Sequence, residues 1–98
     1  MPILAIPQLF VILAQTPTPD KLAAALSLKY PGNHIGLFPG QWLLVTGGKT
    51  AQEVSDDLGI STGETGSAVV IAGNGSYFGR GNPQIWEWLK SRLGAPSA

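Results

Sequence analysis

The sequence predicts a single α+β domain of four strands and three helices. Two apolar runs, at residues 9–13 and 68–72, have the composition of buried strands. Thr50 opens a capped amphipathic pattern and Asn82-Pro83 opens another, and both patterns are typical of helices. No internal repeat or linker-like segment divides the 98 residues, so one domain spanning residues 1–98 is expected.

The apolar N-terminal run is interpreted as a strand, with a weak targeting segment as the alternative. Residues 3–14 follow no Lys or Arg and contain no small-residue cleavage site of the kind that ends a signal peptide. The run is also shorter than the ~20 residues that a membrane helix requires. Because Pro7 has no N–H to donate to a neighbouring strand, the first strand is expected at residues 8–14.

A first helix is expected at Thr18-Pro19-Asp20, which supplies a hydroxyl N-cap, a proline at the first helical position and an acid in the first turn. The apolar stripe of this helix consists of Leu22, Ala25, Leu26 and Leu28. Pro31-Gly32 ends it, because the residue before a proline disfavours helical backbone. Two strands joined through Pro39-Gly40 are then expected at residues 34–38 and 41–46.

The second helix has the most complete end signals. Thr50 and Glu53 fit a capping box, in which each side chain accepts a hydrogen bond from the backbone N–H of the other. Gly59 stands where a left-handed residue closes a helix, and Ile60 follows it as the hydrophobic contact of a Schellman motif. The residues from Ala68 to Ala72 then read as a strand buried on both faces.

The last helix is expected to run from Asn82-Pro83 to about Leu93-Gly94, and residues 95–98 are expected to be disordered. The resulting order of elements is typical of a ferredoxin-like βαββαβ antiparallel sheet with an added C-terminal helix. That arrangement has the strand order 4-1-3-2, with two helices on one face of the sheet. The added helix or a partner subunit must then cover the other face.

Charge and composition favour self-association over nucleic-acid binding. Six Lys and Arg balance six Asp and Glu, whereas a nucleic-acid-binding protein carries a basic excess. Charged residues make up 12% of the chain, so little charge repulsion opposes a homo-oligomer. The chain has no cysteine, which excludes disulfides and thiolate sites. A cytoplasmic protein that binds neither membrane nor nucleic acid is therefore expected.

The most specific candidate site is the glycine-rich segment before the last helix. A strand, a glycine-rich loop and a helix N-terminus can together bind phosphate, and an arginine can clamp the anion. The candidate ligand-binding residues are Gly75, Ser76, Tyr77, Arg80, Asn82 and Trp86. The spacing G-x-G-x-x-x-G departs from the dinucleotide fingerprint, and no Walker lysine accompanies it. The alternative is that the glycines only shape a turn and that Asn82 only caps the helix.

Trp86 and Trp88 are candidates for a partner interface. They are separated by about 200° around a helix, so they do not share one face. One is expected to pack on the sheet and the other to be left for a partner or a stacked ligand. The alternative is that both are partly buried within the monomer.

No catalytic or metal-binding constellation is readable. His34 is the only histidine and has no acid beside it in the sequence to complete a zinc site or a general base. Asp56 and Asp57 point to different sides of their helix, so a solvated face is expected rather than a carboxylate pair. The predicted function is a non-enzymatic module, without cofactor, that binds a small anion, a nucleotide or a protein. The alternatives are a structural protein and a small enzyme whose intersubunit site combines residues 76–80 with His34 or Trp42 of a neighbour.

Several segments carry a resemblance to other proteins. They are GQWL from Gly40, TAQEVS from Thr50, LGI from Leu58, YFGR from Tyr77 and NPQIWEWL from Asn82. This pattern resembles small uncharacterised proteins of bacteria and phages. The resemblance covers the chain from Gly40 onward and implies no activity, cofactor or site.

Overall fold

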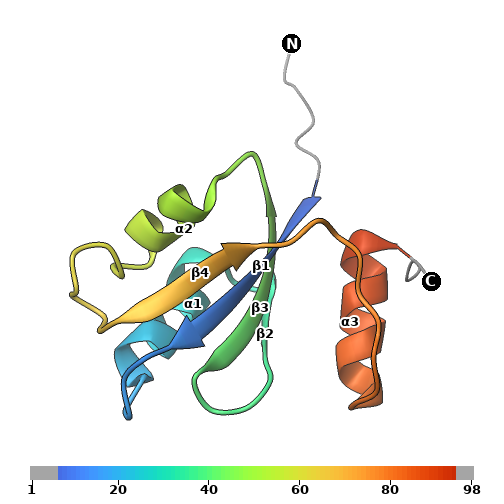
Figure 1. Ribbon diagram of the computed structural model, residues 1–98, viewed down its shortest axis with the longest axis horizontal. Coiled ribbons are helices and arrows are strands. Elements are labelled where there is room, and N and C mark those ends of the chain that lie inside the picture. The colour runs from blue at the N-terminus through green and yellow to red at the C-terminus, as the bar shows by residue number, and fades with distance from the viewer. Residues whose placement is uncertain (1–6, 95–98) are drawn as a thin grey trace.

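The structure, a computed structural model, describes residues 7–94 as an α+β domain with one four-stranded antiparallel sheet (Figure 1). In chain order the elements are β1 (Pro7–Ala14), α1 (Asp20–Lys29), β2 (His34–Gly36), β3 (Gln41–Gly47), α2 (Ala51–Asp57), β4 (Ala68–Ala72) and α3 (Pro83–Leu93). The expected disorder of residues 95–98, and the first residues of the possible targeting segment, lie outside the described part of the chain. Within that part, no helix has the length and apolar character needed to cross a membrane.

The sheet has the order β2-β3-β1-β4, so β1 and β3 occupy its centre as predicted. Neighbouring strands are antiparallel in every pair. β1 begins one residue earlier than expected, at Pro7, which lies opposite Gly47 of β3. A proline is tolerated there because the first residue of a strand can lack its N–H without breaking the ladder. β2 is shorter than the predicted strand at residues 34–38 and ends at Gly36.

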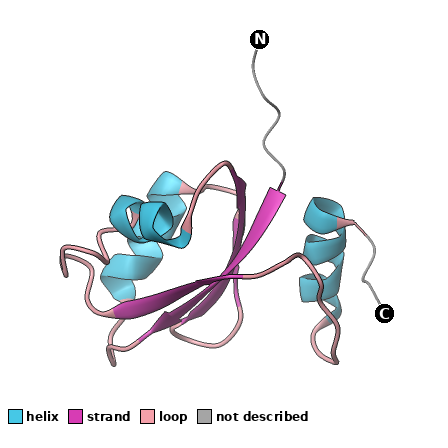
Figure 2. Cartoon of the chain, turned by 45° about the horizontal axis from the view of Figure 1, so that its top comes forward, coloured by secondary structure: helices cyan, strands magenta, loops and turns pink. Residues whose placement is uncertain are grey.

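Side chains of the central strands alternate between the two faces of the sheet, and each face has its own core. Phe10 and Leu44 point toward α1 and α2 and are fully buried. The core on that side consists of Phe10, Ile12, Leu22, Leu26, Tyr30, Trp42, Leu44, Val54 and Leu58. Leu9 and Val45, from the same two strands, pack with Leu89 of α3 on the opposite side. The helices therefore lie on both sides of the strands, with α3 apart from α1 and α2 (Figure 2).

The prediction that β4 is buried on both faces is wrong. Val69 and Ile71 point to the α3 side of the sheet and remain 43% and 49% exposed. β4 lies at the sheet edge, whereas α3 packs against residues of β1 and β3. An apolar run does not by itself distinguish a fully covered strand from an edge strand that is covered on one face.

The start of α1 also differs from the prediction. The N-cap position is Pro19, whose side chain contains no hydrogen-bond acceptor, and Thr18 lies outside the helix. Leu22 and Leu26 are fully buried as expected, but Leu28 is 77% exposed. Because Leu28 follows Leu26 by two positions, it is rotated by about 200° around the helix and faces solvent.

The predicted ends of α2 are confirmed. The Thr50 hydroxyl accepts the Glu53 N–H at 3.1 Å, and the Glu53 carboxylate accepts the Thr50 N–H at 2.9 Å. Gly59 has a φ of +76° and donates its N–H to the Asp56 carbonyl at 3.2 Å. The Ile60 N–H donates to the Ser55 carbonyl at 3.0 Å, which completes the Schellman motif.

Replacing the N-cap, Thr50→Ala, should lower the free energy of unfolding by about 0.5–2 kcal/mol, the usual cost of a lost cap. Thr50→Ser retains the hydroxyl acceptor and should stay close to the wild type. Urea denaturation followed by circular dichroism measures both variants. Equal stability of the alanine and serine variants would contradict the capping role.

The closing glycine can be tested against a matched position. Gly59→Ala should cost about 1 kcal/mol or more, because a left-handed φ disfavours alanine. The new Cβ would also lie 3.1 Å from Cγ2 of Thr65. Gly63 has a similar φ of +80° but has nothing within 4 Å of an added Cβ. Urea midpoints should therefore fall further for Gly59→Ala than for Gly63→Ala, and the reverse order would contradict the packing argument.

Candidate functional site

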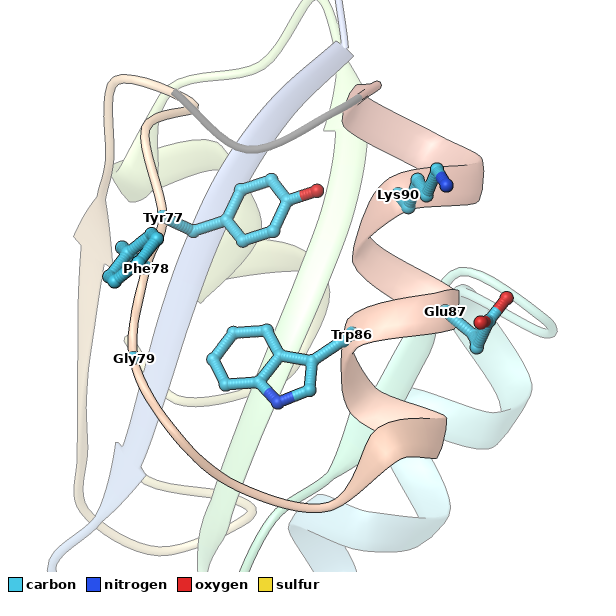
Figure 3. A pocket seen from close by; sticks show the side chains of 6 residues that line it. All are labelled: Tyr77, Phe78, Gly79, Trp86, Glu87 and Lys90. Atoms are coloured by element: carbon cyan, nitrogen blue, oxygen red, sulfur yellow. The ribbon is translucent and has the colours of Figure 1, made fainter. Parts of the chain in front are cut away.

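The segment from Tyr77 to Gly94, which we call the loop–helix unit, is closed by three contacts between its own residues. The Tyr77 ring stacks on Trp86 with 6.2 Å between ring centroids and 13° between planes. The Tyr77 hydroxyl donates to the Gly94 carbonyl at 2.6 Å. The Trp86 indole N–H donates to the Gly81 carbonyl at 3.3 Å. The loop is thereby held against α3, as Figure 3 shows for Tyr77 and Trp86.

An apolar cleft of about 400 Å³ lies between the loop–helix unit and the α3 side of the sheet. Leu9 of β1 and Leu43 of β3 contribute from the sheet, and Ile85 and Leu89 contribute from α3. The remaining lining residues are Leu37, Ser76, Tyr77, Phe78, Arg80, Gly81 and Trp86. Arg80 is the one charged residue of this lining, so the cleft combines an apolar interior with a single cationic group.

Four of the six residues predicted to bind a ligand line this cleft, namely Ser76, Tyr77, Arg80 and Trp86. They come from two segments, the loop before α3 and α3 itself. Gly75 is not among the lining residues, and its φ of +83° places it in a turn of the loop. In the same turn the Ser76 N–H donates to the Asn74 side chain at 3.0 Å.

Asn82, the sixth predicted residue, caps α3. Its side chain accepts the Gln84 N–H at 2.9 Å, and its carbonyl accepts the Ile85 N–H at 3.0 Å. Pro83 has no N–H to offer. The start of α3 therefore already supplies acceptors within the chain to two N–H groups that an anion would otherwise contact.

A second cavity, of about 320 Å³, lies on the other side of the stacked rings (Figure 3). Tyr77, Phe78 and Trp86 line both cavities, so these aromatic side chains form the partition between them. Glu87 and Lys90 of α3 contribute charged groups to the second cavity only. Phe78 is 81% exposed, so a large apolar group stands at the mouth of both cavities.

The structure half-buries both Trp86 and Trp88, in agreement with the alternative in which the monomer uses both rings. Trp88 lies beneath the Arg92 guanidinium, whose carbon is 4.8 Å from the ring centroid. Arg92 also donates to the Gly32 carbonyl in the turn after α1. Arg92 therefore fastens the end of α3 to the rest of the domain.

A polar cluster that the sequence did not indicate joins the ends of α1 and α2. The Tyr30 hydroxyl donates to the Asp57 carboxylate at 2.6 Å, and the Lys49 ammonium forms an ion pair with the same oxygen. Lys49 also lies 5.6 Å from the centroid of the Tyr30 ring. The Asp57 side chain is 34% exposed and takes part in this cluster, whereas Asp56 is exposed. No local pattern links Tyr30 to a carboxylate 27 residues away.

The three groups of this cluster shift one another's pKa values. Burial, and then the hydrogen bond to Asp57, raise the pKa of Tyr30 to about 12. The hydrogen bonds from Lys49 and Tyr30 hold the pKa of the Asp57 carboxyl below its usual value. The hydrogen bond to Asp57 raises the pKa of Lys49. Each shift favours the protonation state in which the cluster is fully bonded, so its role is to hold the two helices together.

No metal site is present among residues 7–94, because no three His, Cys, Asp or Glu side chains there are close enough to share an ion. The imidazole Nδ1 of His34 lies 2.9 Å from the Tyr30 carbonyl and donates to it. His34 lies opposite Leu44 in the sheet, and so on the face that packs against α1 and α2. The cleft lies on the other face, so His34 and Ser76 of one chain are separated by the sheet.

Comparisons with protein-family models, curated proteins and solved structures gave no match.

The Tyr30 cluster should make stability depend on alkaline pH. The folded protein retains the Tyr30 proton up to about pH 12, whereas the unfolded chain releases it near pH 10. Between these values the folded state binds more protons, so the free energy of unfolding should fall as pH rises. Urea midpoints measured across this interval should fall less steeply in Tyr30→Phe than in the wild type. Identical slopes would contradict the assignment.

Proposed function

We propose that the protein is a non-enzymatic binding module whose ligand occupies the cleft between the sheet and the loop–helix unit. The observation that supports this proposal is the convergence of Ser76, Tyr77, Arg80 and Trp86 on one apolar cleft. Small-molecule sites in proteins are typically clefts of ~300–1,000 Å³, lined mostly by apolar and aromatic side chains with a few polar groups. A cleft of about 400 Å³ whose polar side chains include Arg80, Ser76 and Tyr77 fits that description.

The lining favours a ligand with an apolar body and one anionic group, such as an aryl or short alkyl carboxylate. Leu9, Leu43 and Leu89 offer an apolar surface and no hydrogen-bonding side chain to the body of the ligand. Arg80 is exposed, and the one ion pair among residues 7–94 joins Lys49 to Asp57 instead. The Arg80 guanidinium is thus free to form a bidentate bond with a carboxylate.

A nucleotide fits this cleft less well than a singly charged anion. A phosphate chain needs several donors, but Asn82 already accepts the N–H groups of Gln84 and Ile85 at the start of α3. Arg80 alone would then face several negative charges. The singly charged amphipathic anion is therefore the proposed ligand class, and nucleotides serve as the comparison.

The proposal of a binding module rather than an enzyme is supported by the separation of the candidate catalytic groups. Ser76 lines the cleft, whereas His34 lies on the opposite face of the sheet. A serine hydroxyl is a weak nucleophile without an adjacent base. The lining of the cleft includes no His, Asp, Glu or Lys that could serve as that base.

We also propose the ferredoxin-like class for this fold, with α3 as an addition. The sheet order β2-β3-β1-β4 reads 4-1-3-2 from the opposite edge. Residues of α1 and α2 share one core on one face of the sheet. Both features support the assignment.

Removal of the cationic group tests the proposed ligand class. Arg80→Ala should change the unliganded free energy of unfolding by less than about 0.5 kcal/mol, because the side chain is exposed. It should weaken binding of an aryl carboxylate by about 1.5–3 kcal/mol, the loss expected for a charge-assisted hydrogen bond. Thermal shift with a panel of aryl carboxylates, alkyl carboxylates and nucleotides measures the effect, because a ligand of the folded state raises the melting temperature.

Lys21→Ala is the matched control, since Lys21 is an exposed cation on α1 and is not a cleft residue. It should leave every ligand-induced shift unchanged. A rise in melting temperature with nucleotides and with no carboxylate would contradict the proposed ligand class and indicate a nucleotide site. No shift with any ligand, together with a large loss of stability in Arg80→Ala, would show that Arg80 has a structural role and would contradict the binding proposal.

A further inference from the structure

β4 is an edge strand whose outer backbone groups have no partner within the described chain. The Gly73 N–H donates to the Leu9 carbonyl at 2.7 Å, and the Gln15 N–H donates to the Ser67 carbonyl at 2.8 Å. In an antiparallel pair the hydrogen-bonded positions alternate, so residues 67, 69, 71 and 73 direct their backbone groups toward β1. The N–H and C=O groups of residues 68, 70 and 72 therefore point outward. Among residues 7–94, no loop or turn hydrogen bond engages them.

This edge has none of the features that usually prevent strand pairing. Exposed edges are commonly blocked by charged side chains, proline, bulges or a very short strand. Residues 65–79 contain no Lys, Arg, Asp, Glu or Pro. The opposite edge of the sheet is different, because β2 has only three residues and Pro39 follows it. The open edge is thus specific to β4.

The sequence of β4 is nearly symmetric about Val70, with Ala68 matching Ala72 and Val69 matching Ile71. An antiparallel pair related by a two-fold axis at Val70 joins Val70 of the two copies and joins Ala68 of each copy to Ala72 of the other. These are the outward-facing positions, so this register forms about six backbone hydrogen bonds between the copies. If the two strands were displaced by one residue, the outward-facing backbone groups of one copy would lie opposite residues of the other copy whose backbone groups are already bonded to β1. In this register the near-symmetry places Ala opposite Ala and Val opposite Ile, so the strand is complementary to a second copy of itself.

The exposed side chains of β4 add apolar surface to the same contact. Val69 and Ile71 are 43% and 49% exposed and lie beside the half-buried Leu13 and Val11 of β1. In the symmetric pair, Val69 of each copy neighbours Ile71 of the other, at a distance where cross-strand side chains pack. No charged group has to lose its hydration for this contact to form.

We propose that two copies of the chain pair β4 with β4, antiparallel and centred on Val70, to form one sheet that continues through both molecules. A closed two-fold contact of this kind needs a self-complementary surface, and the strand provides one. The contact leaves the proposed ligand cleft free, because none of its lining residues belongs to β4. The dimer and the ligand site can therefore be tested separately.

The molar mass and one proline variant test the contact itself. Light scattering at tens of micromolar should give twice the 10.2 kDa mass of the chain. Ala72→Pro removes an outward N–H and no bond to β1, so it should weaken the dimer at least tenfold while circular dichroism remains that of the wild type. A monomer in the wild type, or an unchanged dimer in Ala72→Pro, would overturn the proposal.

A charge placed on the exposed face gives a second test that does not depend on proline. Ile71→Lys should weaken the dimer at least tenfold, because it puts a cation in each half of an apolar contact. Leu28→Lys is the matched control, since Leu28 is 77% exposed on α1 and lies outside the contact. Equal effects of the two substitutions would overturn the assignment of the interface to β4.

Engineered cysteines test the register, since the chain has no cysteine of its own. Val70→Cys should form an intermolecular disulfide on mild oxidation, because Cα atoms of a hydrogen-bonded antiparallel pair are ~5.5 Å apart. Ala68→Cys should not, since the two copies of residue 68 would be ~14 Å apart. The double variant Ala68→Cys/Ala72→Cys should cross-link without altering the more buried Val70. Cross-linking by Ala68→Cys as fast as by the double variant would overturn the proposed register.

Discussion

The rest of the structure depends on β1, because this strand supplies side chains to both cores. Phe10 and Ile12 are fully buried against α1 and α2, while Leu9 packs with Leu89 of α3. The strand is hydrogen-bonded to β3 on one side and to β4 on the other. The alternation of β1 side chains between the two faces of the sheet therefore determines where both helical layers pack. A one-residue slip in the register of β1 would move each set of side chains to the opposite face.

The two layers are fastened to the sheet in different ways. On one side, α1 and α2 share a continuous core and are joined at their ends by Tyr30, Lys49 and Asp57. On the other side, α3 has one fully packed residue, Leu89, and the Arg92 bond to the Gly32 carbonyl. The cleft lies on this second side, where packing is less extensive. A less packed layer is where a protein can accommodate a ligand at small cost to its stability.

The predictable parts of the fold are those encoded by neighbouring residues. The capping box at Thr50, the closing Gly59 and the Asn82 cap each depend on residues within one or two turns, and each was found from the sequence. The central place of β1 followed from the strand order 4-1-3-2 that the order of elements predicted. Of the candidate site, Ser76, Tyr77, Arg80 and Trp86 were identified together because they flank one helix start.

The features that were missed depend on contacts between distant segments. The exposure of Val69 follows from where α3 packs, and the Tyr30–Asp57 bond joins the ends of two different helices. The half-burial of both Trp86 and Trp88 likewise depends on the loop and on Arg92. Local sequence patterns contain no information on such pairings, because the fold alone brings the partners together.

The closed form of the loop–helix unit has a consequence for the thermodynamics of recognition. Tyr77 is fixed at both ends of its side chain, by stacking on Trp86 and by its bond to the Gly94 carbonyl. The aromatic wall of the cleft is therefore assembled before any ligand arrives. A molecule entering the cleft would not have to immobilise these rings, so little side-chain entropy would be lost on binding. Affinity at such a preorganised wall depends mainly on how well the shape of the ligand matches it.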